Sequence, residues 1–481
     1  MKPLFVAVGM AVVLSVDAGA QSSPPRNSAL TTVAPAYLIS TAQATAWHRF
    51  KAAGGPTFSG STSWKRFLGF LESNLAKQGV VDLTKNRWTY DRWRTGEWPG
   101  RGSWSLMSAG KRVPVASYGA YSGSTGPRGV SAELVYYDPN APPSSMRGKI
   151  VVYEAPPHPE PPYDERYRTW FTINDSEFAS DSAGFHPRFA RVPPDETITL
   201  DTWWQLRGVS VNFYDLLAKA GALAGVAVFN MSYERLAGLY TFPVQTQHQT
   251  PVLYLDRAAG LRVIDDAKQG KRAVLELRAT VEPTETYQLI GYLPGRAYGT
   301  AGDERVLLTT HTDGPSISQD DGALGLLGIV TYFAHIPRRD RPKTLMVFLD
   351  NRHYMPGMEP AFAEQDWFAR HPEERKKIGG IIAMEHLGEM EFREQGETVT
   401  TTGRPEITFL WTRASPNQVE EAIEAVKANR LPRTLVQAVE RPGIHGGTQG
   451  TWYGMGTITL QWDLPGFSML GYLGGYWTTR S

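Results

Sequence analysis

Hydrophobic positions repeat with two different spacings along this chain. Between Trp64 and Leu75 apolar residues recur at steps of three and four, which places them on one face of a helix. Gly79 follows, where a helix C-terminal cap is expected. From about residue 284, short apolar runs alternate with helix-like segments instead. That alternation predicts an α/β fold in which a mostly parallel sheet carries helices on both faces.

The chain after residue 284 supplies the expected elements of this sheet. Strands are expected at 305–310, 344–350, 380–385, 407–411 and 457–460. Helices are expected at 322–336, 359–370 and 416–429. In open α/β sheets, functional sites form beyond the carboxyl ends of the strands, so polar residues at those ends are the first candidates for chemistry.

Residues 128–283 show a different pattern. Short β-type runs at 149–153 and 225–229 stand on either side of a helix candidate at 211–221. A stretch rich in proline and aromatic residues, 155–207, interrupts them and includes Trp170. An insertion of that length is either a lid or docking surface, or simple cover for a sheet edge.

The first residues have the pattern of an export signal. Lys2 gives a positive start, an apolar stretch follows, and Ala18-Gly19-Ala20 is a small-residue cleavage site. We therefore expect a signal peptide at 1–20, a Ser/Pro-rich linker at 21–36, and a mature protein in the periplasm or outside the cell. No later stretch is long and apolar enough to span a membrane.

Composition narrows the class of protein. The chain has 481 residues, enough for two or three domains, with 41% hydrophobic and 20% charged residues. A net charge of +1 argues against a nucleic-acid partner, which requires a basic surface. There is no cysteine, so any metal ligands must be His, Asp or Glu.

Ionisable residues follow the first buried strand. His311 and Asp313 come directly after the run 306–310. The imidazole of His311 can ligate a metal, and the carboxylate of Asp313 can hold its other nitrogen and fix the tautomer. Asp320 and Asp321 then precede an apolar helix. They can bridge metals, or they can simply be acidic capping residues.

Two further strands end in the same kind of residue. The run 345–349 leads into Asp350, Arg352 and His353, and the run 380–384 leads into Glu385 and His386. Near the C-terminus, His445 lies in a glycine-rich loop. Nitrogen and oxygen ligands projecting from one sheet edge suit zinc best, with other transition metals allowed.

At this point the sequence resembles the zinc-dependent aminopeptidases and carboxypeptidases related to glutamate carboxypeptidase and the transferrin receptor. The catalytic part matches through Ile290-Gly291-Tyr292-Leu293-Pro294-Gly295 and His311-Thr312-Asp313. The stretch 219–226 and the segment Thr250-Pro251-Val252-Leu253-Tyr254 resemble the protease-associated (PA) domain inserted in many members. The resemblance implies a zinc-exopeptidase-like domain formed by 37–127 and 284–481, with a β-rich PA-like insertion at 128–283.

The resemblance also implies roles for individual residues. Two zinc ions would share Asp320 as a bridge. The first ion would take His311 and Glu385, and the second would take His353 and His445. The family's general base, a glutamate, corresponds to Arg352 in this chain. A guanidinium is always protonated and cannot act as a base, so a substitute is needed. Asp350, His386 and Glu389 are the candidates by sequence proximity.

Three functions remain open from the sequence. The first is a metal-dependent hydrolase of peptide or small amide substrates that uses one or two zinc ions. The second is a non-catalytic binding protein on the same scaffold, in which Arg352 grips a ligand carboxylate. The third is a metal enzyme of another class, such as a lyase, cyclase or oxidoreductase, in a histidine-rich site.

Overall fold

The computed structural model describes residues 33–96, 102–155, 171–172, 213–240, 247–317, 319–355, 367–387, 390–405, 408–413, 416–429, 431, 434–439 and 466–471. The expected signal peptide, the strand expected at 457–460, and the residues His445 and Glu389 lie outside these ranges. The chain divides into a unit Met1–Leu38, in which Pro35–Tyr37 forms a short 3-10 turn, and a unit Ile39–Ser481, described below.

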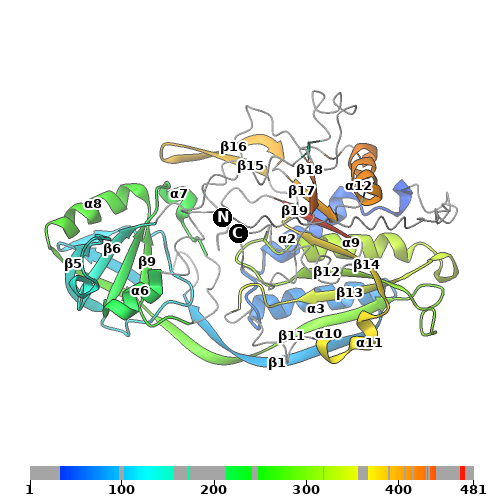
Figure 1. The fold of residues 1–481 in the computed structure, drawn as a ribbon, viewed down its shortest axis with the longest axis horizontal. Coiled ribbons are helices and arrows are strands. Elements are labelled where there is room, and N and C mark those ends of the chain that lie inside the picture. The colour runs from blue at the N-terminus through cyan, green and yellow to red at the C-terminus, as the bar shows by residue number, and fades with distance from the viewer. Residues whose placement is uncertain are drawn as a thin grey trace, which may run out of the picture. The chain divides into compact units, whose positions relative to one another are not determined.

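A nine-stranded sheet forms the part of the second unit that carries the polar strand ends (Figure 1). Its strand order is β1-β11-β13-β12-β14-β19-β17-β18-β7. The four central strands β13, β12, β14 and β19 run parallel to one another. The strands are β1 (Val81–Thr95), β11 (Ala279–Leu293), β12 (Arg305–His311), β13 (Thr344–Asp350), β14 (Ile378–Glu385), β17 (Thr408–Arg413), β18 (Thr434–Val439), β19 (Gly466–Gly471) and β7 (Phe171–Thr172).

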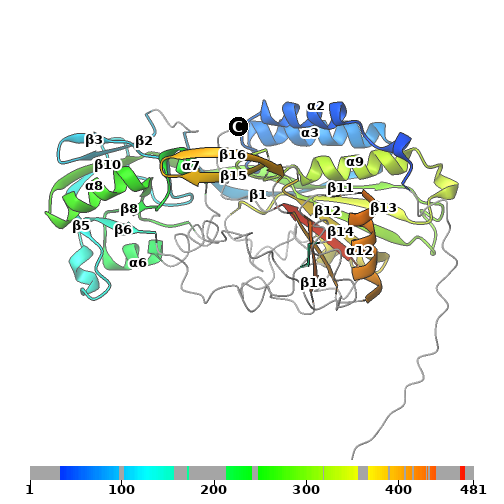
Figure 2. The ribbon, with the colours of Figure 1, turned by 90° about the horizontal axis from the view of Figure 1, so that it is seen from above.

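Helices cover both faces of this sheet, because alternate residues of each buried strand point to opposite sides. On one face α2 (Thr41–Ala52), α3 (Thr62–Lys77) and α9 (Gly322–Ala334) lie together (Figure 2), and Leu308 and Val347 belong to their hydrophobic core. On the other face α10 (Trp367–Arg370) packs on a cluster that includes Leu307, Met346 and Phe348. The expected α/β fold is confirmed.

The periodic stretch in the first hundred residues forms helix α3 as expected. Its buried residues include Trp64, Leu68 and Leu75, the positions spaced by three and four. Ser61 caps the start by accepting a hydrogen bond from the backbone N–H of Trp64. Gly79, with φ of 82°, follows the C-cap residue in the left-handed conformation that glycine adopts most easily. The helix then packs on α9, so this early segment helps to build the sheet's covered face.

A second, eight-stranded sheet has the order β3-β2-β10-β5-β6-β8-β9-β4. Its strands β5, β6, β8 and β9 are parallel, and α6 (Phe213–Ala220) and α8 (Arg257–Lys268) pack against it. The strands are β2 (Trp104–Ser108), β3 (Lys111–Val113), β4 (Ser117–Tyr118), β5 (Val130–Tyr136), β6 (Ile150–Glu154), β8 (Ala224–Val228), β9 (Val252–Leu255) and β10 (Arg272–Leu277).

This sheet begins earlier in the chain than the segment 128–283. Strands β2 to β4 come from the region expected to join the other domain. These strands belong to the eight-stranded sheet because β2 pairs with β10 and β4 pairs with β9, and the partners in each pair are far apart in sequence. The likeness of this sheet to a PA domain stays a prediction. Of the insertion 155–207, Phe171–Thr172 pairs with β18 at the edge of the nine-stranded sheet.

Remaining helices and a hairpin complete the described elements. The hairpin pairs β15 (Met390–Gln395) with β16 (Thr398–Pro405), and Glu394 accepts hydrogen bonds from the backbone N–H of Ser232 at 3.0 Å and from Arg257 at 2.6 Å. None of the helices in the described ranges is long and apolar enough to cross a membrane. The other helices and turns are η2 (Pro143–Met146), α7 (Tyr233–Leu236), η4 (Arg338–Asp340), α11 (Pro372–Arg375) and α12 (Pro416–Asn429).

Candidate metal centre

Three adjacent parallel strands bring the predicted residues to one sheet edge. Strand β12 lies between β13 and β14, and in the register of the first pair His311 stands opposite Asp350. Glu385 is the last residue of β14. Because parallel strands end at the same edge, these three side chains start from neighbouring positions. All three residues are buried.

The orientation of His311 is set by its own loop. Its Nδ1 lies 2.7 Å from the backbone carbonyl oxygen of Asp313, to which it can donate a hydrogen bond. The carboxylate of Asp313, expected to play this role, is 3.9 Å from Nδ1. Burial lowers the pKa of His311 to about 4, so the ring is neutral at physiological pH. Nε2 is buried without a hydrogen-bond partner, as in an imidazole poised to ligate a metal.

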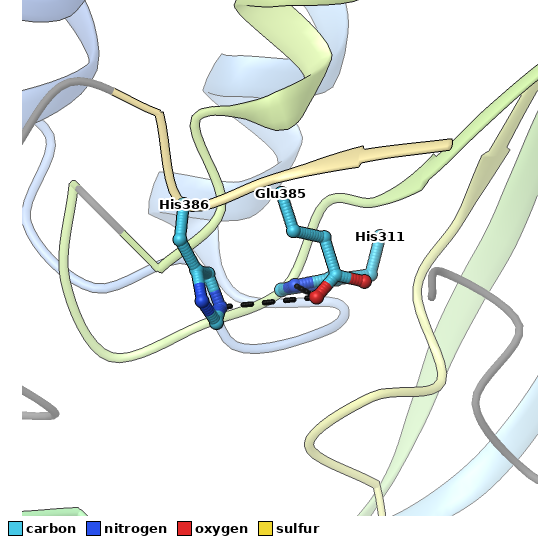
Figure 3. A group of neighbouring side chains, drawn as sticks. All are labelled: His311, Glu385 and His386. Atoms are coloured by element: carbon cyan, nitrogen blue, oxygen red, sulfur yellow. Dashed lines mark ion pairs between the residues drawn. The ribbon is translucent and has the colours of Figure 1, made fainter. Parts of the chain in front are cut away.

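Glu385 is the most unusual carboxylate of the site. It is 1% exposed, and neither carboxylate oxygen has a hydrogen-bond partner. Burial raises its pKa well above the ordinary value. The Nε2 atoms of His311 and His386 each lie 3.8 Å from the same Glu385 oxygen. Figure 3 shows the three side chains converging, and their ligand atoms lie within 4.8 Å of one another.

His386 joins the group through an uncommon backbone conformation. Its φ is 51°, in the left-handed region that residues other than glycine rarely adopt. Such strain is concentrated at functional sites, where surrounding contacts stabilise it. The side-chain amide nitrogen of Gln319 lies 2.7 Å from Nε2 of His386. The sequence suggested a base or a supporting residue here, and the structure places a ring nitrogen of His386 among the three atoms that could hold a metal ion.

The residues present fit a metal ion. Two imidazoles and a carboxylate are a ligand set that zinc commonly takes, and a buried acceptor without a donor is otherwise costly. Five buried carboxyl groups, Glu385 among them, lie on the strand ends and the loops beside them, together with two buried basic side chains, Lys51 and Arg352. A cation bound there would compensate the buried carboxylates that the protein does not pair. The carboxylates belong to Asp313, Asp320, Asp321, Asp350 and Glu385.

Asp320, the expected bridge between two ions, has partners from the protein. Lys51, near the end of α2, forms a buried ion pair with its Oδ1. Thr57 donates a hydrogen bond to its Oδ2, and the backbone N–H of Thr57 donates to the carbonyl of Gly314 at 2.9 Å. Burial raises the pKa of Asp320 to about 6, although Lys51 and Thr57 act in the opposite direction. Asp320 does not belong to the described group of ligand atoms.

Asp321 stands at the N-cap of α9 but its side chain does not cap the helix. It accepts a hydrogen bond from the backbone N–H of Leu387 at 2.7 Å, and the other oxygen lies 3.4 Å from His48 Nε2. Gly322 lets the start of α9 lie close to the end of β14, since a Cβ at this position would overlap the carbonyl oxygen of Met384. Asp321 therefore ties the start of α9 to the loop that carries His386.

Arg352 is occupied by a neighbour. Its Nε lies 3.0 Å and its Nη2 2.7 Å from the two carboxylate oxygens of Asp350, a bidentate pair. Burial by itself raises the pKa of Asp350, but Arg352 and the hydrogen bonds from Gln288 and Asn351 bring it below its ordinary value. Asp350 is thus a weak candidate for a substitute base. The Nε/Nη2 edge of Arg352 is therefore occupied and not available to a ligand carboxylate.

His353 lies against His311, with ring centroids 4.1 Å apart. Burial lowers its pKa well below the ordinary value. The backbone N–H groups of His353 and Tyr354 donate to the carboxylate of Asp313, at 3.2 and 2.7 Å. Burial nevertheless raises the pKa of Asp313 to about 8. Asp313 thereby supports the loop after β13, and His353 stands beside the ligand group rather than within it.

Sequence reasoning missed the contribution of the first helices. Lys51, Thr57 and His48 all face the strand ends, although nothing near them in sequence marks them. Lys51 looks like an ordinary basic residue in the last turn of a helix, where the helix dipole favours it. The one available signal is an apolar setting, since Trp47 and Phe50 precede Lys51 within one helical turn.

Comparison with known structures identifies the fold. The chain resembles the aminopeptidase from Aneurinibacillus sp. strain AM-1, with a TM-score of 0.51, 13% identity, and 91% and 87% of the two chains covered. It resembles BSAP, a zinc aminopeptidase from Bacillus subtilis, with a TM-score of 0.53, 15% identity, and 89% and 84% covered. It also resembles a peptidase M28 precursor from Shewanella amazonensis SB2B, with a TM-score of 0.54, 16% identity, and 91% and 90% covered.

These likenesses extend over most of the chain at low sequence identity. The fold is therefore like that of these aminopeptidases and of the M28 peptidase. No family model matches the sequence, and no curated protein matches it either. Similarity at this level concerns the fold, so the chemistry has to be argued from the residues.

Proposed function

We propose that this protein is an exported, metal-dependent hydrolase of peptide or amide bonds, similar in action to an aminopeptidase. The observation that carries the proposal is the group His311, Glu385 and His386, in which His311 Nε2 and both Glu385 oxygens are buried without hydrogen-bond partners. The similarity of the fold to zinc aminopeptidases supports zinc as the ion. A zinc ion bound there supplies a Lewis acid that polarises a carbonyl and lowers the pKa of water.

The chain's own residues hold and tune this centre. Asp313 fixes the tautomer of His311 through its backbone carbonyl, which leaves Nε2 for the ion. His353, neutral and packed on His311, excludes water from that side of the ring. The second set of ligands expected from the sequence, His353 with His445, is not used here: His353 lies outside the group of three ligand atoms, and His445 lies outside the described ranges.

A hydrolase of this kind needs a residue that accepts a proton from water in place of the usual glutamate. Arg352 cannot accept a proton, and Asp350 is held in its charged form by Arg352. Of the two candidates within the described ranges, Asp350 and His386, His386 has the stronger geometric support, since its Nε2 is 3.8 Å from a carboxylate oxygen of Glu385. It can serve as ligand or as proton acceptor, but one nitrogen cannot do both at once.

The binding-protein alternative has less support. It rested on Arg352 gripping a ligand carboxylate, and the bidentate fork of Arg352 is taken by Asp350. No contact in the described part of the chain favours a lyase, cyclase or oxidoreductase over a hydrolase.

Metal content and turnover together test the proposal. The mature protein is expected to contain zinc and to cleave aminoacyl p-nitroanilides or short peptides, with both properties lost in His311→Ala. Asp256→Ala, a change at a strand end in the other sheet, is the matched control and retains both. A metal-free protein, or an unchanged rate in His311→Ala, contradicts the proposal.

His386→Ala separates the two roles of that residue. If His386 is a ligand, the variant loses zinc along with activity. If it is the proton acceptor, zinc stays bound while kcat falls by about 10²–10⁴-fold, the usual contribution of general-base catalysis. Zinc content by mass spectrometry, beside steady-state rates, distinguishes these outcomes. Full activity with full metal content shows that it has neither role.

A further inference from the structure

Lys51 is a lysine placed where lysines are seldom found. Its side chain is 1% exposed, and that of its partner Asp320 is 0% exposed. The ammonium also donates to the carbonyl of Ser316 at 3.3 Å and lies 5.4 Å from the ring centroid of Phe67. A lysine is almost never fully buried unless it is paired, because removing its charge from water is costly. The pair with Asp320 is therefore the reason that Lys51 is tolerated here.

Two buried carboxylates of this site, Asp320 and Glu385, have opposite surroundings. Asp320 has an ammonium on one oxygen and a hydroxyl donor on the other. Glu385 has no hydrogen-bond partner on either oxygen and faces two imidazole nitrogens. A metal ion bound to Asp320 would lie within a few ångströms of a buried ammonium, and like charges in such a dry site repel strongly. The ion therefore belongs on the Glu385 side.

From this contrast we infer that the ammonium of Lys51 takes the place of a metal ion at Asp320, so that the centre binds one metal ion rather than two. Asp320 is then a structural partner of Lys51 and not a metal ligand. This inference rests on the proposed metal centre and corrects the expectation that Asp320 bridges two ions. Arg352 acts in parallel on the neighbouring strand, where it neutralises Asp350. Two of the carboxylates at this sheet edge are thus compensated by the protein itself.

Lys51 comes from helix α2 and not from a strand of the sheet. Lys51 lies near the end of α2, which packs with α3 over α9, so the ammonium reaches the strand ends from the helical layer (Figure 2). The backbone bond from Thr57 to Gly314 holds the following loop on the same edge. Helix packing and this loop contact thus place the ammonium beside Asp320.

Zinc stoichiometry of the full mature chain tests the inference. The protein is saturated with zinc, dialysed, and analysed by mass spectrometry against protein concentration. One ion per chain is expected in the wild type. Asp320→Asn is expected to keep one ion with less than a tenfold change in affinity, whereas Glu385→Gln loses more than a hundredfold. Two ions in the wild type, or loss of zinc in Asp320→Asn, overturns the inference and leaves the proposed hydrolase intact. Absence of zinc in the wild type overturns the proposed function itself.

Thermal stability gives a readout that does not need metal or activity. In EDTA, Lys51→Met leaves the buried Asp320 charge without its cation, so the melting temperature falls. The double variant Lys51→Met/Asp320→Asn removes both charges and is expected to melt well above Lys51→Met. If Lys51→Met does not fold, recovery of a folded double variant supports the pair equally. Additive losses in the double variant contradict it.

Discussion

Two carboxylates at the ends of parallel strands, one in each sheet, behave in opposite ways. Asp256 follows β9 in the eight-stranded sheet and caps α8, since its Oδ1 accepts hydrogen bonds from the backbone N–H groups of Ala258 and Ala259 at 2.9 and 3.0 Å. Glu385 ends β14 in the nine-stranded sheet and has no hydrogen-bond partner on either oxygen. Both residues are almost completely buried.

Position at a strand end therefore does not by itself indicate chemistry. A carboxylate beside a helix N-terminus is stabilised by the N–H groups it accepts from, and it needs no ion. A buried carboxylate without donors is unstable unless it binds a cation or a proton. The partner set, and not the location, therefore separates the candidate metal ligand from the structural cap. The predictions below test that separation.

The largest effect is expected for Glu385→Gln. The change removes the only acidic member of the group formed with His311 and His386, so zinc affinity and hydrolysis should each fall more than a hundredfold. In EDTA, however, the melting temperature should stay the same or rise, because an unpartnered buried carboxyl is replaced by a neutral amide. Calorimetry with and without zinc measures both. A variant that melts much lower in EDTA shows that Glu385 is structural, as Asp256 is.

Arg352→Met is expected to cost about 3–5 kcal/mol of stability, because it leaves the buried charge of Asp350 uncompensated. Urea unfolding of the metal-free protein measures this loss. The double variant Arg352→Met/Asp350→Asn should recover most of it, since no unpaired charge remains. Equal stability of Arg352→Met and wild type would mean that the bidentate pair contributes little.

The pH dependence of the metal-free protein reports on Asp313. Its pKa of about 8 in the folded state lies above the unfolded value of 3.8, so stability present in acid is lost as pH rises toward 8. His311, with a folded pKa of about 4, acts oppositely, but only between 4 and 6.5. Between pH 6.5 and 8 the wild type should therefore lose about 2 kcal/mol from Asp313 alone.

Asp313→Asn should make that decline shallower without removing it, because the raised pKa of Glu385 contributes in the same direction. Melting temperatures in EDTA at half-unit steps of pH measure both slopes. A variant whose slope equals that of the wild type contradicts the assignment of the decline to Asp313.

The smallest effect belongs to the cap. Asp256→Ala removes the side-chain acceptor at the start of α8 and should cost about 1 kcal/mol, with zinc content and hydrolysis unchanged. Chemical denaturation and zinc analysis of the same preparation check both parts. Loss of zinc in this variant would contradict the assignment of Asp256 as a helix cap that takes no part in metal binding.

Much of the fold followed from local pattern. The runs at 305–310 and 344–350 became β12 and β13, because unbroken apolar stretches of that length belong in a sheet covered on both faces. The run at 380–385 is part of β14, which starts two residues earlier at Ile378. The boundaries of the eight-stranded sheet could not be predicted from local pattern, since β2 to β4 are short and pair with strands far away in the sequence.

The candidate site divides in the same way. His311, Asp350 and Glu385 could be placed at one edge from the sequence, because parallel strands share an edge whatever lies between them. The conformation of His386 could not, since its left-handed backbone is imposed by the surrounding fold. The ion pair between Arg352 and Asp350 could not be predicted either, although the two residues are close in sequence.

Which residues stand at the strand ends can be predicted from sequence, since alternation and apolar runs are local properties of the chain. Which of those residues are already neutralised depends on how distant segments pack together. Lys51 and Asp320 are far apart in the chain, and they meet because α2 and α3 pack over α9. A buried charge is governed by what lies within a few ångströms of it in space, and no local pattern contains that information.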